Sequence, residues 1–212
     1  MVLRRHFRVG KGRLASYNYV DLVTGRSYNK LYIGTASGDD AVVGYVASFQ
    51  AFDSNDFSTV QSCSAAEWVQ KTDFDFDLIV NRPFTISGTF IASFSMGAKK
   101  NTQTTEVRVW VRVRKYSGTT ETELALGKSE EESTTDTNGS GWRKAVTDEI
   151  SNTGFKAGDK LRITVELWGK ANAGWVYMSH DPGNTDTPAS GNVGLDALDT
   201  DFIIFLPFRV YD

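Results

Sequence analysis

The stretch Glu106-Val-Arg-Val-Trp-Val-Arg-Val-Arg114 decides the fold class of this chain. Valine occupies every second position, and arginine or tryptophan fills the positions between the valines. Successive side chains of a β-strand point to opposite faces, so this alternation predicts a strand with one buried and one exposed face. A slip of one residue would turn the arginines into the core, so the pairing register of this strand is strongly specified.

The same alternation recurs along the chain. In the segment 161–167, Leu161, Ile163, Val165 and Leu167 fall on one face and polar residues on the other, and 84–94 alternates around phenylalanines. Further strands are predicted at 3–9, 16–23, 27–34, 42–52, 74–80, 122–126, 142–149, 173–179 and 202–210. Helical turns are predicted only at 64–70, where a serine and a glutamate stand at capping-box spacing.

Ten to twelve short strands with little helix predict an all-β protein, an antiparallel two-sheet β-sandwich that is jelly-roll-like. An immunoglobulin-like sandwich is the second topology, because no Cys-Trp-Cys framework is present. No composition break marks a second domain, so one domain over 1–212 is predicted. The strand at 202–210 is apolar on both faces and is expected to lie centrally. Long loops are expected at 127–141 and 180–200, where polar residues, glycines and prolines gather.

Composition and charge exclude several classes of function. The 40% hydrophobic content fits a globular chain, and the net charge of -3 gives no general attraction to nucleic acid or to an anionic membrane. No apolar run approaches the roughly 18 residues of a membrane span. Residues 1–13 are basic without a following apolar stretch, which favours a basic arm or edge strand over a signal peptide. Arg4, Arg5 and Arg8 are therefore candidate contacts to an acidic partner surface.

The residues that could carry catalysis are few and scattered. Cys63 is the sole cysteine, which excludes a disulfide framework, and two histidines do not make a zinc site. His180 and Asp181 precede a proline and are interpreted as the start of a turn. Carboxylate pairs such as Glu121 and Glu123 have no fixed separation. The chain is predicted not to be an enzyme and to need no cofactor.

Two other groups of residues suggest binding. Asp73-Phe-Asp-Phe-Asp77 places three carboxylates on one strand face, so Asp73, Asp75 and Asp77 are candidate calcium ligands, and a solvated face is the alternative.

The tryptophans are candidate contact residues. Trp110 and Trp168 fall on polar strand faces, and Trp142 and Trp175 lie at loop edges. Outward tryptophans are typical of interface anchors or sugar-stacking platforms, and they also occur under loops or a second sheet. All three interpretations stay open.

Three stretches resemble β-rich structural proteins of tailed-bacteriophage virions. They are residues 17–34 (YNYVDLVTGRSYNKLYIG), residues 155–168 (FKAGDKLRITVELW) running on to 177–184 (YMSHDPGN), and the closing 202–208 (FIIFLPF). The resemblance covers about half of the chain, and capsid decoration and vertex proteins are examples of this class.

The resemblance implies a virion structural protein that is assembled in the host cytoplasm. Its expected partners are a major capsid protein, other virion proteins or copies of itself in a trimer or pentamer, with no nucleic acid and no membrane. The alternative function is a carbohydrate-binding or receptor-binding module of the tail-fibre type, assisted by calcium.

Overall fold

The computed structural model describes residues 26–37, 43–48, 50, 58–181 and 201–209. Within these ranges the chain forms ten β-strands and no helix, so the predicted all-β class is confirmed. The strands are β1 (Arg26–Ser37), β2 (Val43–Ser48), β3 (Ser58–Ile79), β4 (Phe84–Lys100), β5 (Thr105–Ser117), β6 (Thr120–Lys128), β7 (Glu132–Thr134), β8 (Ser140–Phe155), β9 (Lys160–Ser179) and β10 (Phe202–Arg209). The described ranges contain no helix of the length and apolar character that a membrane span requires.

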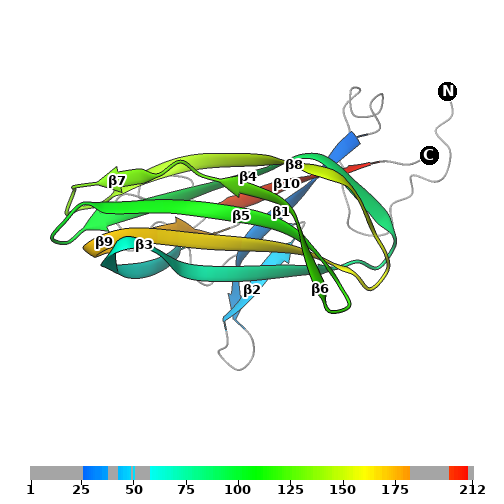
Figure 1. The fold of residues 1–212 in the computed structure, drawn as a ribbon, viewed down its shortest axis with the longest axis horizontal. Helices are drawn as coiled ribbons and strands as arrows, with labels where there is room; N and C mark the ends of the chain where they lie inside the picture. The colour runs from blue at the N-terminus through cyan, green and yellow to red at the C-terminus, as the bar shows by residue number, and fades with distance from the viewer. Residues whose placement is uncertain (1–25, 38–42, 49, 51–57, 182–200, 210–212) are drawn as a thin grey trace.

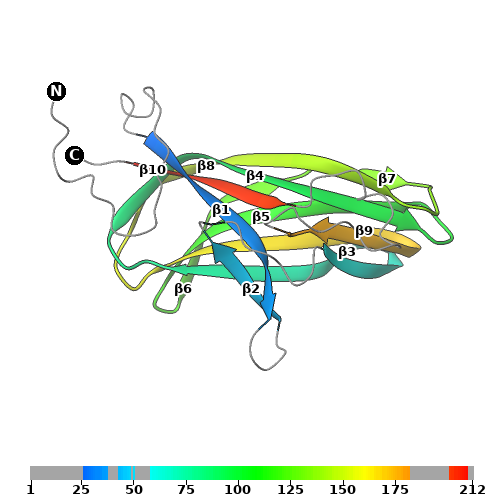
Figure 2. The same ribbon diagram turned by 180° about the vertical axis from the view of Figure 1, so that it is seen from behind.

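The strands form two layers with the strand order of a jelly roll (Figures 1 and 2). One layer runs β6–β5–β9–β3, with β7 beside the start of β5. The other runs β8–β4–β10–β1–β2, and every pairing is antiparallel. The ends of β4 and β9 pair with each other and join the layers. β10 lies between β1 and β4, which confirms its predicted central place and the predicted jelly-roll-like sandwich.

The core lies between the two layers. The four valines of β5 are fully buried, as the alternation of 106–114 predicts. They form one cluster with apolar side chains of the other layer, including Phe90 and Phe94 of β4 and Phe202 of β10. The Phe94 and Phe202 rings lie 5.0 Å apart. A sandwich of this kind buries the inward side chains of both sheets and leaves the outward ones to form two outer surfaces.

Several strands are longer than predicted. The segments 161–167 and 173–179 belong to one strand, β9, which has 20 residues. Glycines at its middle let other chain segments approach closely: a Cβ at Gly169 would lie 2.3 Å from Cys63 Sγ, and one at Gly174 would lie 2.0 Å from Thr105 Oγ1. These glycines predicted a break between two strands. The strand continues through them because neighbouring segments occupy the space that side chains would otherwise fill.

The predicted helical turns at 64–70 are wrong. These residues belong to β3, which pairs with β9 over almost its whole length. The register shifts between Ala65 and Val69, where three residues of β3 bulge out opposite one residue of β9. Long-range pairing supplies the backbone hydrogen bonds that a local helix would otherwise make, so it overrides the capping signal.

The loop predicted at 127–141 is shorter than expected. β6 runs to Lys128, β7 occupies three residues, and β8 begins at Ser140. A turn stabilised by Asp136, whose Oδ1 accepts the backbone N–H of Asn138 at 2.8 Å, connects β7 to β8.

Several predictions concern other parts of the chain. The strands at 3–9 and 16–23, the basic arm at 1–13 and residues 182–200 of the second loop lie outside the described residues. The first two residues of that loop, His180 and Asp181, are buried.

Candidate functional site

The outward side of the β6–β5–β9–β3 layer carries an unusual concentration of tryptophan, arginine and carboxylate. We call this surface the outer face. It is made of Trp68, Asp73, Asp75, Asp77, Glu106, Arg108, Trp110, Arg112, Arg114, Glu121, Glu123, Lys128, Lys160, Arg162, Thr164, Glu166, Trp168 and Lys170.

Strand register assembles the outer face. Arg108 of β5 stands opposite Trp168 of β9, and Trp110 stands opposite Glu166. Arg108 and Trp110 face outward because the valines beside them on β5 face the core. The two β9 residues alternate in the same way with the buried Val165 and Leu167. The alternation that decides the fold therefore also places alternate arginines and tryptophans on one surface.

Arg108 lies at the centre of a tryptophan cluster. Its guanidinium carbon is 4.1 Å from the centroid of the Trp68 ring, 4.8 Å from that of Trp110 and 5.3 Å from that of Trp168. The rings of Trp110 and Trp168 are themselves 4.8 Å apart and tilted by 41°. Indole is the most favourable ring for a cation–π contact, which contributes about 0.5–1 kcal/mol at an exposed site. One arginine shared by three indoles holds all four side chains in place.

The cluster extends along the layer through further cations. Lys128 Nζ lies 4.6 Å from the Trp110 ring centroid, and the guanidinium of Arg112 lies 5.6 Å from it. Arg108 also donates a hydrogen bond to Glu131 at 2.7 Å. The tryptophan rings of the outer face are thus in contact with cations of the same chain.

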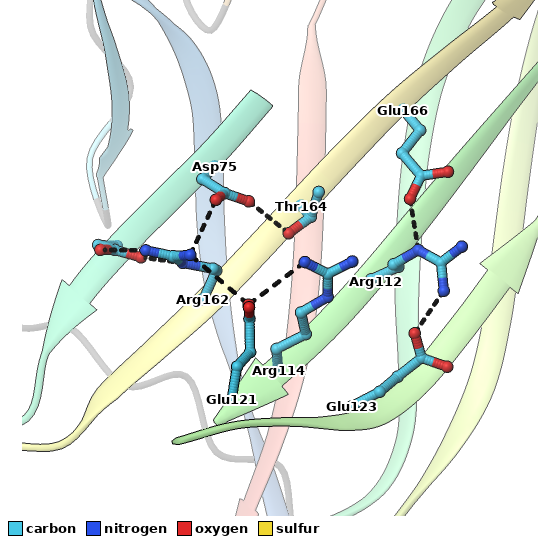
Figure 3. Close-up of polar contacts among 9 residues, drawn as sticks. Asp75, Arg112, Arg114, Glu121, Glu123, Arg162, Thr164 and Glu166 are labelled. Atoms are coloured by element: carbon cyan, nitrogen blue, oxygen red, sulfur yellow. Dashed lines mark hydrogen bonds and ion pairs between the residues drawn. The ribbon is translucent and has the colours of Figure 1, made fainter. Parts of the chain in front are cut away.

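Next to this cluster the outer face becomes a network of ion pairs (Figure 3). Arg112 donates to Glu166 with Nε and to Glu123 with a terminal nitrogen. The Glu166 residue is only 4% exposed, and its second oxygen accepts the indole N–H of Trp168 at 2.9 Å. Burial alone would lower the pKa of Arg112, but the hydrogen bonds to the two carboxylates outweigh burial and raise it. Glu166 therefore ties the ion pairs to the tryptophans.

Arg162 is the second centre of the network. It holds Asp77 in a two-pronged pair at 2.7 and 3.0 Å. It also holds Asp75 at 2.9 Å (Figure 3). Asp77 also accepts a hydrogen bond from Lys160 at 2.9 Å. The hydrogen bond from Arg162 is the main cause that lowers the pKa of Asp77 to about 2. Glu121 lies 3.6 Å from Arg162 and 3.2 Å from Arg114, so it links β6 to the same network.

The three candidate calcium ligands lie on this face, and two of them are partners of cations. Asp75 and Asp77 are paired with Arg162, and Asp75 also accepts the hydroxyl of Thr164 at 2.6 Å. Burial, and then the charge of Asp75, raise the pKa of Asp73. Within the ranges that the structure describes, no group of three histidine, cysteine or acidic side chains is arranged to hold a metal ion. Phe74 and Phe76, on the opposite face of the strand, are buried. This arrangement is the one expected for a solvated carboxylate face, the alternative to a calcium site.

The predicted interface tryptophans separate into three environments. Trp110 and Trp168 lie together on the outer face. Trp142 packs against the hydrophobic core and is partly buried, so it acts as internal cover. Trp175 is exposed, at 41%, and lies opposite Ser62 of β3 and Lys99 of β4. Arg4, Arg5 and Arg8 lie outside the described residues.

Sequence reasoning missed Trp68. The segment around it was expected to be helical, so its side chain was not assigned to a strand face. In the structure the bulge of β3 sets Trp68 over Arg108. No local pattern signals this position, because it depends on how many residues the bulge contains.

Two further reactive groups among the described residues, Cys63 and His180, are buried. Cys63 is buried, and burial raises the pKa of its thiol, which disfavours the nucleophilic thiolate. His180 is buried next to Thr59, with 2.9 Å between Nε2 and the hydroxyl oxygen.

Comparison with known proteins identifies the fold. The sequence matches no protein-family model and no curated protein. An α-amino acid ester hydrolase matches over 86% of this chain at 11% identity, with a TM-score of 0.54. An aminopeptidase from a marine sediment archaeon of the Thaumarchaeota matches over 88% at 8% identity, with a TM-score of 0.51. The chain spans only 36% and 37% of the lengths of these proteins. At such identities the likeness shows the fold alone.

These neighbours correct the prediction that the chain is not an enzyme. The solved structures that share its sandwich include a hydrolase and an aminopeptidase, so the prediction of a non-enzymatic protein is contradicted. The prediction rested on the absence of catalytic motifs in the sequence. A structure of infectious bursal disease virus also matches, over 83% of this chain and 41% of its own at 12% identity, but its TM-score of 0.23 carries no argument.

Proposed function

We propose that this β-sandwich is an assembly module of a virion, of the decoration or stabilising type, and that it binds a partner protein through the outer face. Its partners would be a major capsid protein, other virion proteins or copies of itself, assembled in the host cytoplasm. The observation that carries the proposal is the cluster of Trp68, Trp110 and Trp168 around Arg108. Tryptophan and arginine are the residues most enriched among the energetic centres of protein interfaces.

The rigidity of the outer face supports the proposal. Association costs about 0.5–1.5 kcal/mol for each flexible side chain that becomes fixed at an interface. Here Arg108, Arg112 and Arg162 are already fixed by indoles and carboxylates before any partner binds. A surface with its side chains held in this way keeps that cost low, which suits contacts repeated many times on one particle.

The charge balance of the outer face supports a protein partner over a nucleic acid. Its arginines on β5 and β9 are paired with carboxylates of β6, β9, β3 and the segment after β6. Nucleic acid binding needs unpaired cations that can replace counterions along the phosphates. A face of neutral pairs gives register to a complementary protein surface instead.

The alternative of a carbohydrate platform on Trp110 and Trp168 is less well supported. Sugar stacking needs an open indole ring, whereas Arg108 and Lys128 lie over these rings. Among the described residues the exposed tryptophan is Trp175, which is not part of the outer face.

The proposal is tested by measuring association of the chain alone and on particles. Lys128→Glu places a negative charge beside Trp110 at the edge of the outer face, and Lys156→Glu makes the same change in the turn between β8 and β9. Sedimentation velocity is expected to show a trimer or pentamer for the wild type and Lys156→Glu, and a smaller species for Lys128→Glu. Electron microscopy of particles that carry the protein is expected to show the outer face covered by a neighbouring subunit. An outer face open to solvent on the particle would refute the proposal.

A further inference from the structure

A hollow of about 500 Å³ lies where the bulge of β3 faces β9 and the connection between β4 and β5. The connection between β4 and β5 turns at one end of the sandwich, at the left of Figure 1. The volume of the hollow is within the range of roughly 300–1,000 Å³ that is typical of small-molecule sites. Ala66 and Ala171 line it with small side chains, and without a bulky residue there the hollow stays open.

The bulge is the cause of the hollow. Ala65 pairs with Ala171 and Val69 pairs with Gly169, so residues 66–68 of β3 loop out opposite Lys170. Bulges of this kind are common beside binding sites because they open space in an otherwise closed sheet.

The walls of the hollow are polar and held in place. The Asn172 amide donates to the side-chain oxygen of Gln103, and the backbone N–H of Asn101 donates to the carbonyl of Ala173 at 3.4 Å. Thr102 and Thr104 add hydroxyl groups to the same wall. Amides and hydroxyls can both donate and accept hydrogen bonds, which is the chemistry that matches a polyhydroxylated ring.

The hollow also carries a net positive charge. Lys170 is paired with Glu106 at 3.1 Å, and Lys100 has no ion-pair partner among the residues that the structure describes. One cation is thus left to bind an anionic group at the rim. A carboxylate forms a charge-assisted hydrogen bond with a lysine ammonium.

We infer that this hollow binds an acidic saccharide, with Lys100 pairing the sugar carboxylate and the wall of Gln103 and Asn172 binding its hydroxyls. The hollow shares Glu106 and Lys170 with the edge of the outer face, but the inference does not rest on the proposed assembly. It places a ligand site at one end of the sandwich, at residues that sequence patterns did not mark.

The test is a titration followed by two-dimensional amide NMR, with D-glucuronate, D-glucose and acetate as probes. Glucuronate is expected to shift the amide signals of residues 102–104 and 170–172 in a saturable way. Glucose is expected to bind about tenfold more weakly, because it lacks the charge-assisted contact. Acetate is expected to shift no signals at the same concentration, because it lacks the hydroxyls.

Two matched variants separate the site from general charge effects. Lys100→Met is expected to weaken glucuronate binding about tenfold, while Lys156→Met, at a turn elsewhere, leaves it unchanged. Circular dichroism and the unfolding midpoint of both variants check that the fold is kept. The inference is overturned if glucuronate causes no saturable shifts, if glucose or acetate binds equally well, or if Lys100→Met binds like the wild type.

Discussion

Replacing Glu166 by glutamine should destabilise the sandwich far more than the same change at an exposed ion pair. Glu166 is buried and accepts hydrogen bonds from both Arg112 and Trp168. The glutamine keeps the volume, but its amide offers one acceptor oxygen where the carboxylate has two. One of the two donors is then left facing an NH₂ group in a buried position.

The magnitude follows from the burial of the pair. An unpaired buried donor costs about 1–3 kcal/mol, and breaking a fully buried ion pair costs about 3–5 kcal/mol. The Arg112 side chain is 19% exposed and keeps Glu123 as a second partner, so water and Glu123 reduce the loss. We expect Glu166→Gln to lower the free energy of unfolding by about 2–3 kcal/mol.

The assay is urea unfolding at neutral pH, followed by circular dichroism in the far ultraviolet so that the nearby tryptophans do not dominate the signal. The matched control is Glu131→Gln, because Glu131 also pairs with an arginine of β5 but has a side chain that is 55% exposed. An exposed pair contributes about 0–1 kcal/mol. A double-mutant cycle with Arg112→Met should give a coupling of about 1–3 kcal/mol. The reasoning is refuted if Glu166→Gln costs no more than Glu131→Gln, or if the coupling is zero.

Three further predictions test other parts of the structure. Gly174→Ala should destabilise the fold by about 1–3 kcal/mol in urea unfolding, because the new Cβ would lie 2.0 Å from Thr105 Oγ1. The control Gly154→Ala, whose Cβ would have no atom within 4 Å, should be neutral or slightly stabilising. Equal effects of the two variants would contradict the close packing of Thr105 against Gly174. Asp73→Asn should raise the unfolding midpoint at neutral pH, since the raised pKa of Asp73 means that the folded state disfavours its charge; a lowered midpoint would count against this. The pKa of Asp77 is about 2 in the folded state against an ordinary value of 3.8, so the stabilisation by its carboxylate is complete above about pH 4 and is lost as the pH falls towards 2. Asp77→Asn should therefore flatten the dependence of the free energy of unfolding on pH in that window. An unchanged dependence would contradict a stabilising pair between Asp77 and Arg162.

Much of the fold was predictable because it rests on period-two alternation, which is a local property of the chain. The valines of β5 are buried and its arginines face outward, as the pattern predicts. The central place of β10 follows from a strand that is apolar on both faces. Strand ends were less predictable, since glycines and bulges inside β3 and β9 resemble breaks in a linear sequence.

The candidate site was predictable only in part. The outward direction of Trp110 and Trp168 follows from alternation, but Trp142 was expected at a loop edge and packs against the core instead. The absence of catalytic motifs suggested a non-enzymatic protein, and the fold shared with two hydrolytic enzymes contradicts that step. A motif census describes residues that are near each other in sequence, whereas sites are assembled across strands.

The amino-acid sequence by itself determined the class of structure and the face on which residues of the regular strands lie, because side-chain direction alternates along a strand that has no bulge. Tertiary structure decided which outward residues meet. The register of β5 and β9 brings Arg108 to Trp168, and the bulge of β3 adds Trp68 to them. It also pairs Asp77 with Arg162, 85 residues away. Such contacts depend on pairing between distant strands and on the length of a bulge, and neither leaves a local signal in the sequence.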